Sequence, residues 1–340
     1  MNSKDRLSAL RRAPGIVRIH GHRGARGIMP ENTMAGFRFA LACGVKVLEC
    51  DVQFARDHTP VITHNARLSP DAVRGADGQW VDGPGPLVHG IGPDELATFD
   101  AGGLRAGTRY AGRFPDQAFL SLEPIPSLDD LAALLARGEH DDVWLNLEIK
   151  SSPHRPEASP PIADMVAAVV AVIRANGLER RTLAQCFDWR VLVEMRRQAP
   201  GVALSFLTAL AGDAGHGGDA GNDEDAGNDE DAGHDEDAGN DEDNIYPDSP
   251  WLAGLATGRR DEDLPRAIAD AGAQAWSPHF ADLTRAQLER AHALGLIVNV
   301  WTVNAPRDID RMIELGADGI ITDYPGRVQR RLRARGMGWV

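Results

Sequence analysis

The sequence of 340 residues has few cysteines and no long hydrophobic run. Cys43, Cys50 and Cys186 are odd in number, lie in apolar segments and lack CxxC spacing, so we expect core residues rather than disulfides or a structural zinc site. No run of about 18 apolar residues is present, and the first residues lack the apolar stretch of a secretory signal. We therefore expect a cytoplasmic protein without a transmembrane segment.

A basic patch is also missing, which argues against nucleic acid as a partner. The formal net charge is −14 at pH 7, but the excess is local. From Ala220, four hexads of the type AGNDED or AGHDED carry three carboxylates each, and with Asp213 and Asp219 they account for the whole imbalance. Residues 212–244 contain no large apolar side chain, so we expect a disordered acidic insert there. Weak attraction of Ca²⁺ is the alternative to a plain solvated loop.

Short β-rich runs alternate with helix-period stretches outside that insert, which is typical of parallel βαβ units. Eight such runs occupy residues 16–21, 45–53, 143–150, 181–187, 202–207, 273–277, 296–303 and 318–322. The chain length fits either one large α/β barrel or two ordinary domains. Eight alternations favour a closed (β/α)₈ TIM barrel over residues 14–340, rather than an open doubly wound sheet.

One region, residues 66–124, breaks the alternation and is rich in Gly, Pro and Asp. So long an irregular connection within a compact domain is usually functional. We expect a small inserted lobe after the second strand, overhanging the C-terminal end of the barrel, where the active sites of such barrels lie.

Carboxylates gather on two of the predicted strands. Glu49 and Asp51 are two positions apart and therefore point to the same face, and Glu148 and Lys150 repeat this spacing. Unpaired carboxylates are costly on strands as apolar as these. We expect Glu49, Asp51 and Glu148 to bind Mg²⁺ or Ca²⁺, with Mn²⁺ also compatible, because hard oxygen ligands suit these ions better than Zn²⁺. The alternative is an ion-pair network in which Arg23 and Lys150 neutralise the carboxylates.

Two histidines flank this cluster in the predicted fold. His22 ends the first strand, and His64 ends the run ARDHTPVITHN, which we interpret as a hairpin returning after the second strand. Either histidine alone is more often structural, but together they suggest an acid-base pair beside a metal-bound anion. Arg23 and Lys150 suit the oxygens of a phosphate. The residues thus favour metal-assisted phosphoryl chemistry.

A series of short motifs resembles the glycerophosphodiester phosphodiesterases, in the order found in that family. They are HRG at 22–24, PENT at 30–33, ExD at 49–51, VITH at 61–64, LEIK at 147–150, QCFD at 185–188, WTVN at 301–304 and DGIITDYP at 318–325. The resemblance implies a barrel with a small lobe after the second strand. It also implies cleavage of a small-molecule substrate such as glycerophosphocholine or glycerophosphoethanolamine, to give sn-glycerol 3-phosphate and an alcohol.

The same resemblance implies roles for individual residues: Glu49, Asp51 and Glu148 bind the divalent metal, His22 and His64 serve as general acid and base, and Arg23 and Lys150 contact phosphate. It further implies that the glycerol 2-hydroxyl attacks phosphorus and displaces the alcohol to form a cyclic phosphate, after which water opens the ring to give glycerol 3-phosphate. Gln185 is a candidate donor near the site. Trp276 and Trp301 are candidates to line the substrate side, with packing at the barrel rim as the alternative.

Two positions depart from the family pattern. Asn65 follows His64 where many relatives have Asp, and His58 occupies a turn position that favours glycine and positive φ. Two other functions stay open at this point. One is phospholipase D-like cleavage of an intact lipid, and the other is a catalytically idle barrel that serves as a scaffold with a Ca²⁺-attracting acidic segment.

Overall fold

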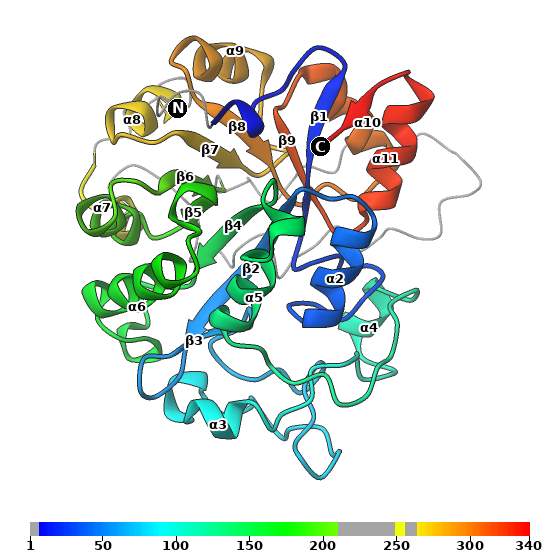
Figure 1. Cartoon of the computed structure of the whole chain (residues 1–340), viewed down its shortest axis with the longest axis vertical. Coiled ribbons are helices and arrows are strands. Elements are labelled where there is room, and N and C mark those ends of the chain that lie inside the picture. Colours follow the sequence, from blue (N-terminus) through cyan, green and yellow to red (C-terminus); the bar gives the residue numbers. More distant parts are fainter. Residues whose placement is uncertain (1–6, 210–248, 256–263) are drawn as a thin grey trace.

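The computed structural model describes residues 7–209, 249–255 and 264–340, so the predicted acidic insert lies outside the described residues. Eight parallel strands form a ring in chain order, and β1 pairs with both β9 and β2, which closes the ring (Figure 1). The strands are β1 (Ile16–Gly21), β2 (Val47–Phe54), β4 (Trp144–Ile149), β5 (Thr182–Cys186), β6 (Ala203–Thr208), β7 (Ala275–Pro278), β8 (Ile297–Val300) and β9 (Gly319–Thr322). The predicted TIM barrel is confirmed, and each strand overlaps its predicted run, with β2, β6 and β7 ending one residue beyond it.

Helices surround the ring and cover its outer face (Figure 1). The longer ones are α2 (Met34–Ala42), α5 (Leu128–Leu135), α6 (Ile162–Ala175), α7 (Trp189–Gln198), α8 (Leu264–Asp270), α9 (Arg285–Ala293), α10 (Pro306–Leu315) and α11 (Pro325–Ala334). Single 3-10 turns are η1 (Leu7–Ala9), η3 (Gly138–His140), η4 (Pro156–Ala158), η5 (Glu179–Arg181) and η7 (Pro250–Leu252). The main apolar core lies between helices and strands, and it includes the buried free thiols of Cys50 and Cys186, whereas Cys43 is partly exposed.

Within the described residues, the segment Pro156–Ala175 is long and apolar enough to cross a membrane. In the structure its helix α6 packs between α5 and α7 in the outer layer of the barrel. One side of α6 is buried, through Met165, Val166, Val169, Val170 and Ile173. Packing against the barrel therefore accounts for its composition.

The strand β3 (Pro60–Ile62) returns antiparallel to β2 and forms the predicted hairpin. His58 stands in its turn with a φ of 71°, the left-handed conformation that its position predicts. A short strand β10 (Gly338–Trp339) pairs with β1 at the other end of the chain.

Residues 66–124 follow the hairpin and contain only short helices, η2 (Val88–Gly90), α3 (Pro93–Leu96) and α4 (Arg109–Arg113). Figure 1 shows α3 and α4 on one side of the barrel, beyond β3 and α2. The segment has a small apolar cluster of its own, built around Leu68, Val73, Val88 and Leu96. The carboxylate of Asp100 accepts hydrogen bonds from three backbone N–H groups in this segment, which fixes a stretch that has little regular structure.

Candidate active site

The three predicted carboxylate ligands meet at the C-terminal end of the barrel. Glu49 and Asp51 lie on β2, and Glu148 lies beside Asp51 in the register of β2 with β4. One oxygen from each carboxylate lies within 4.8 Å of the others, and all three residues are buried. Strand periodicity produces this arrangement, because residues two apart on a strand share one face.

Charge is crowded at this cluster. Burial raises the pKa of Glu49 well above its usual value, and repulsion from Asp51 and Glu148 adds to the effect. Burial likewise raises the pKa of Glu148 to about 7, against the attraction of Lys150. Burial acts in the same direction on Asp51, but Lys150 and Arg23 outweigh it and hold the pKa of Asp51 below its usual range. Buried carboxylates at this spacing fit a hard divalent cation, which would remove the repulsion.

Arg23 and Lys150 contact the same carboxylates. Lys150 Nζ lies 3.0 Å from Asp51 Oδ1 and 2.5 Å from Glu148 Oε1. Arg23 Nε lies 3.0 Å from Asp51 Oδ2, and its guanidinium also pairs with Glu31 at 3.2 Å. The ion-pair network considered as an alternative therefore exists. It does not exclude a metal, because two basic side chains face four carboxylates and leave negative charge uncompensated.

Neighbouring groups fix the orientation of the carboxylates. The Arg23 backbone N–H donates to Glu49 Oε2 at 2.8 Å, the Asn32 amide donates to Asp51 Oδ2 at 2.9 Å, and the Gln185 amide donates to Glu49 Oε1 at 3.3 Å. Arg23 and Asn32 have φ angles of 48° and 55°, so two left-handed residues turn the 22–33 connection toward the cluster. Such outer contacts orient metal ligands and set their basicity.

His22 is held by a buried carboxylate that the sequence reasoning did not single out. Its Nδ1 lies 2.7 Å from Asp323 Oδ1, and its Nε2 lies 3.9 Å from Glu49 Oε2. Arg26 donates to both oxygens of Asp323 at 2.9 Å. Burial alone would raise the pKa of Asp323, but Arg26 and His22 keep it below its usual value. Asp323 therefore stays ionised, and the His22 Nδ1–H donates to it.

His64 has a different partner. It follows β3 and is half-buried, and its Nδ1 lies 2.8 Å from Asn65 Oδ1. Since the amide oxygen only accepts, Nδ1 carries the proton and Nε2 is the basic nitrogen of the neutral ring. The Gln53 side chain donates to the His64 carbonyl at 3.0 Å and fixes the backbone at this point.

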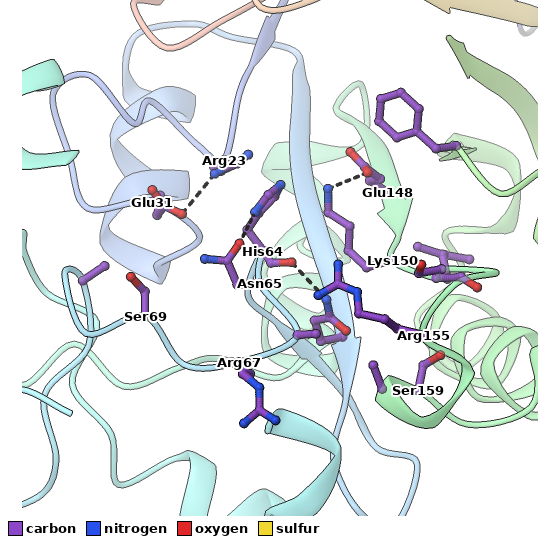
Figure 2. Close-up of a pocket in the computed structure, with 18 of the residues that line it drawn as sticks. Arg23, Glu31, His64, Asn65, Arg67, Ser69, Glu148, Lys150, Arg155 and Ser159 are labelled. Carbon is purple, nitrogen blue, oxygen red and sulfur yellow. Dashed lines mark hydrogen bonds and ion pairs between the residues drawn. The ribbon is translucent and has the colours of Figure 1, made fainter. Parts of the chain in front are cut away.

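Two adjoining cavities lie over the cluster. The inner one, of about 30 Å³, is bordered by His22, Glu49, Gln185 and Trp301, and the outer one, of about 480 Å³, opens toward the lobe. Both are bordered by Arg23, His64, Glu148, Lys150 and Phe187. Figure 2 shows the outer cavity, with the ion pairs from Arg23 to Glu31 and from Lys150 to Glu148.

The two predicted tryptophans lie in different environments. Trp301 borders the inner cavity and packs edge-on against Phe187 at 5.4 Å between ring centroids. For Trp276 the prediction is wrong, because this side chain lies in the core between barrel and helices and donates to Thr208 Oγ1 at 2.9 Å. Side chains alternate along β7, so its neighbour Ser277 points to the other face and contacts Ser205 on the adjacent strand β6 instead.

The lobe and the loop after β4 supply residues that the sequence did not suggest. Tyr110 from α4 donates a hydrogen bond to Glu31, and Phe114 packs its ring against the Arg26 guanidinium, 4.6 Å from its centroid. Arg67 from the lobe and Arg155 from the loop after β4 border the outer cavity. Irregular segments carry no periodicity, so only the folded structure brings these side chains to the site.

Comparison with known proteins identifies the family of the chain. The model of the glycerophosphoryl diester phosphodiesterase family matches residues 22–219 and 243–327. The chain belongs to the glycerophosphoryl diester phosphodiesterase family. It is 24% identical to a glycerophosphodiester phosphodiesterase of Caldanaerobacter subterraneus subsp. tengcongensis, over 94% of this chain and 98% of that protein.

Solved structures have the same fold. A candidate glycerophosphoryl diester phosphodiesterase from Silicibacter pomeroyi is 41% identical, with a TM-score of 0.81 over 98% of this chain and 99% of that one. An Oleispira antarctica phosphodiesterase, solved with its product sn-glycerol-3-phosphate, is 19% identical, with a TM-score of 0.61 over 94% of this chain and 97% of that one. The family match covers every residue of the site, from His22 to Asp323.

Proposed function

We propose that this chain hydrolyses glycerophosphodiesters of the glycerophosphocholine and glycerophosphoethanolamine type to sn-glycerol 3-phosphate and an alcohol. The observation that carries the proposal is the position of two histidines, each anchored through Nδ1, beside three buried carboxylates and a cavity. Family membership supports it, and so does the product bound to the Oleispira antarctica relative.

Glu49, Asp51 and Glu148 would hold a divalent cation, with Mg²⁺, Ca²⁺ and Mn²⁺ as the candidates. When bound, such an ion supplies positive charge that stabilises the phosphate oxygens in the transition state. Arg23 and Lys150 border the cavity beside these carboxylates and would bind the remaining phosphate oxygens.

The two histidines would move the protons. In the first step one takes a proton from the attacking glycerol 2-hydroxyl, and the other gives a proton to the oxygen of the departing alcohol. In the second step the roles reverse, and water opens the cyclic phosphate to give glycerol 3-phosphate. Asp323 holds His22 by Nδ1 and Asn65 holds His64 by Nδ1, so in each ring Nε2 is the nitrogen that exchanges protons. Asp323 also stabilises His22 when the ring is protonated, a role that a buried carboxylate plays well.

The test incubates purified protein with glycerophosphocholine or glycerophosphoethanolamine in Mg²⁺, Ca²⁺, Mn²⁺ or EDTA, and measures glycerol 3-phosphate. We expect product with at least one metal, none in EDTA, and a loss of at least about 10²-fold in His22→Ala. His140→Ala is the matched control, because His140 precedes β4 at the opposite end of the barrel. Absence of product with every metal, or full activity of His22→Ala, would refute the proposal.

Two further arms separate the other functions. Vesicles of phosphatidylethanolamine test phospholipase D-like cleavage. Release of ethanolamine from the vesicles, without turnover of the glycerophosphodiesters, would assign that activity. A chain that binds metal but turns over none of these substrates would be a scaffold. The intact set of His22, His64 and the three carboxylates argues against that outcome.

A further inference from the structure

The outer cavity contains two arginines that the carboxylate cluster does not engage. Arg155 lies in the exposed loop between β4 and η4, and its guanidinium makes no ion pair or hydrogen bond with any residue that the structure describes. In Figure 2 this side chain extends from its loop toward the centre of the cavity. Arg67 lies in the lobe, where its Nη1 donates to the Gly85 carbonyl at 2.9 Å, and this bond fixes the side chain without neutralising its charge.

The two other basic side chains around the cavity are already paired with carboxylates. Lys150 pairs with Asp51 and Glu148, and Arg23 pairs with Asp51 and Glu31. Glu31 additionally accepts the hydrogen bond from Tyr110. Among the residues that line the outer cavity, this leaves Arg67 and Arg155 opposed by a single carboxylate, that of Asp71. Among the described residues, the outer part of the cavity therefore has an excess of positive charge.

The head group of the substrate belongs in this part of the cavity. Phosphate oxygens have to lie near Glu148, Lys150 and His64, which border both cavities. The inner cavity of about 30 Å³ gives little room, so the larger and more variable alcohol extends into the outer cavity of about 480 Å³. Ser69, Ser152 and Ser159 also border the outer cavity and can bind hydroxyl groups of the alcohol.

We propose that Arg155 and Arg67 select glycerophosphodiesters whose alcohol carries an anionic group, either a carboxylate or a second phosphate. This inference rests on the proposed function and ranks its substrates, so that choline and ethanolamine esters are cleaved, but less efficiently than anionic ones. A guanidinium binds carboxylate and phosphate oxygens through paired N–H donors, and it repels a quaternary ammonium. A choline pocket is built in the opposite way, from aromatic faces without a competing cation.

Two matched substrate pairs test the selection. Glycerophosphoserine and glycerophosphoethanolamine differ only by a carboxylate, and glycerophosphoinositol 4-phosphate differs from glycerophosphoinositol only by a phosphate. We expect the wild type to show a kcat/KM about five- to tenfold higher for the anionic member of at least one pair. The pair that responds identifies the anionic group.

Variants locate the source of that preference. We expect Arg155→Gln and Arg67→Gln each to lower the ratio, and the double variant to bring it to about one. Arg285→Gln, on the exposed side of α9, is the matched control and should keep the wild-type ratio. Circular dichroism confirms that each variant is folded. The preference should also shrink at high salt, because exposed charges are screened.

The outcomes separate this inference from the function on which it rests. Turnover of all four substrates with wild-type ratios at or below one overturns the anionic selection and leaves the phosphodiesterase function in place. Absence of turnover on every glycerophosphodiester overturns the function. In that case calorimetric binding of the same four compounds decides the selection, since equal affinity within each pair contradicts it and tighter binding of an anionic member through Arg155 supports it.

Discussion

The two walls of the site anchor their histidines to different kinds of partner, a carboxylate on one side and an amide on the other. On one wall, His22 follows β1 and is anchored to Asp323, which is buried and paired with Arg26. On the other wall, His64 follows β3, is half-buried, and is anchored to the neutral amide of Asn65. Both contacts use Nδ1, so both favour the tautomer with its proton on Nδ1, but only the first adds negative charge.

This difference shows that positioning and electrostatic tuning are separable. An amide is sufficient to hold an imidazole in one tautomer, whereas a carboxylate also favours the protonated ring. The buried wall therefore depends on more residues, because the Asp323 carboxylate is paired with Arg26. Arg26 in turn packs against Phe114 from the lobe. Substitutions beside His22 should therefore lower kcat more than substitutions beside His64.

The largest effect is expected from Asp323→Asn. The asparagine amide can donate to His22 Nδ1, which favours the tautomer with its proton on Nε2 and removes the charge that stabilises the protonated ring. We expect kcat to fall about 10²-fold or more, with a changed pH profile of kcat/KM. Steady-state kinetics between pH 5 and 9 measures both.

A matched pair at the other end of the barrel controls for stability. Asp318 directly precedes β9, at the opposite end of that strand from Asp323, and its Oδ2 lies 2.8 Å from His292 Nε2. Asp318→Asn should lower stability without the loss in kcat. Because Asp323 acts through His22, the double variant Asp323→Asn with His22→Ala should be no slower than His22→Ala alone. A further large drop in the double variant would contradict this role.

The second prediction concerns acid stability. The pKa of Asp323 is lowered in the folded chain by Arg26 and His22, against the effect of burial. A lowered pKa contributes stability above the unfolded value of about 3.9, and this contribution is lost as the pH falls toward the folded value. We expect Asp323→Asn to be less stable than wild type by roughly 2 kcal/mol at pH 7, with the gap narrowing below about pH 4.5.

Urea unfolding at a series of pH values from 7 to 3.5 measures this gap. A gap that stays constant over the whole range would show that the cost of the substitution is packing rather than charge. Asn65 beside His64 is the comparison. Its amide does not titrate, so it contributes no pH-dependent term to the free energy of unfolding.

The sequence predicted the carboxylate cluster better than the carboxylate that anchors His22. Glu49, Asp51 and Glu148 could be found because a strand places alternate residues on one face, and β2 and β4 are buried throughout. Asp323 was missed although it directly follows β9, because its partner Arg26 is 297 positions away in the chain. For Trp276 the strand was predicted and its face was not, since AQAWSP has no clear polar alternation.

The outer cavity was beyond prediction for a related reason. Arg67 and Arg155 come from the lobe and from the loop after β4, where neither helical nor strand periodicity applies. Their approach to one cavity depends on the fold of both segments. The positions most relevant to substrate choice were therefore the least visible in the sequence.

The smallest effect is expected from Asn65→Asp, which gives His64 the same kind of partner as His22. The shape of the contact at 2.8 Å is kept, and only a charge is added. Because a carboxylate favours the protonated imidazole, the limb of the kcat/KM profile that depends on His64 should move to higher pH by up to about one unit. The maximal rate should change by less than about fivefold, since the half-exposed position allows solvent to screen the charge.

Asn65→Ala is the control for positioning alone. It removes the anchor without adding charge, so it should lower kcat severalfold and leave the pH limb where it is. The two variants together decide whether the amide matters for orientation or for charge. If Asn65→Asp lowered kcat as much as Asp323→Asn does, the two walls would be equally sensitive to charge, and the contrast between a tuned and a merely oriented histidine would be lost.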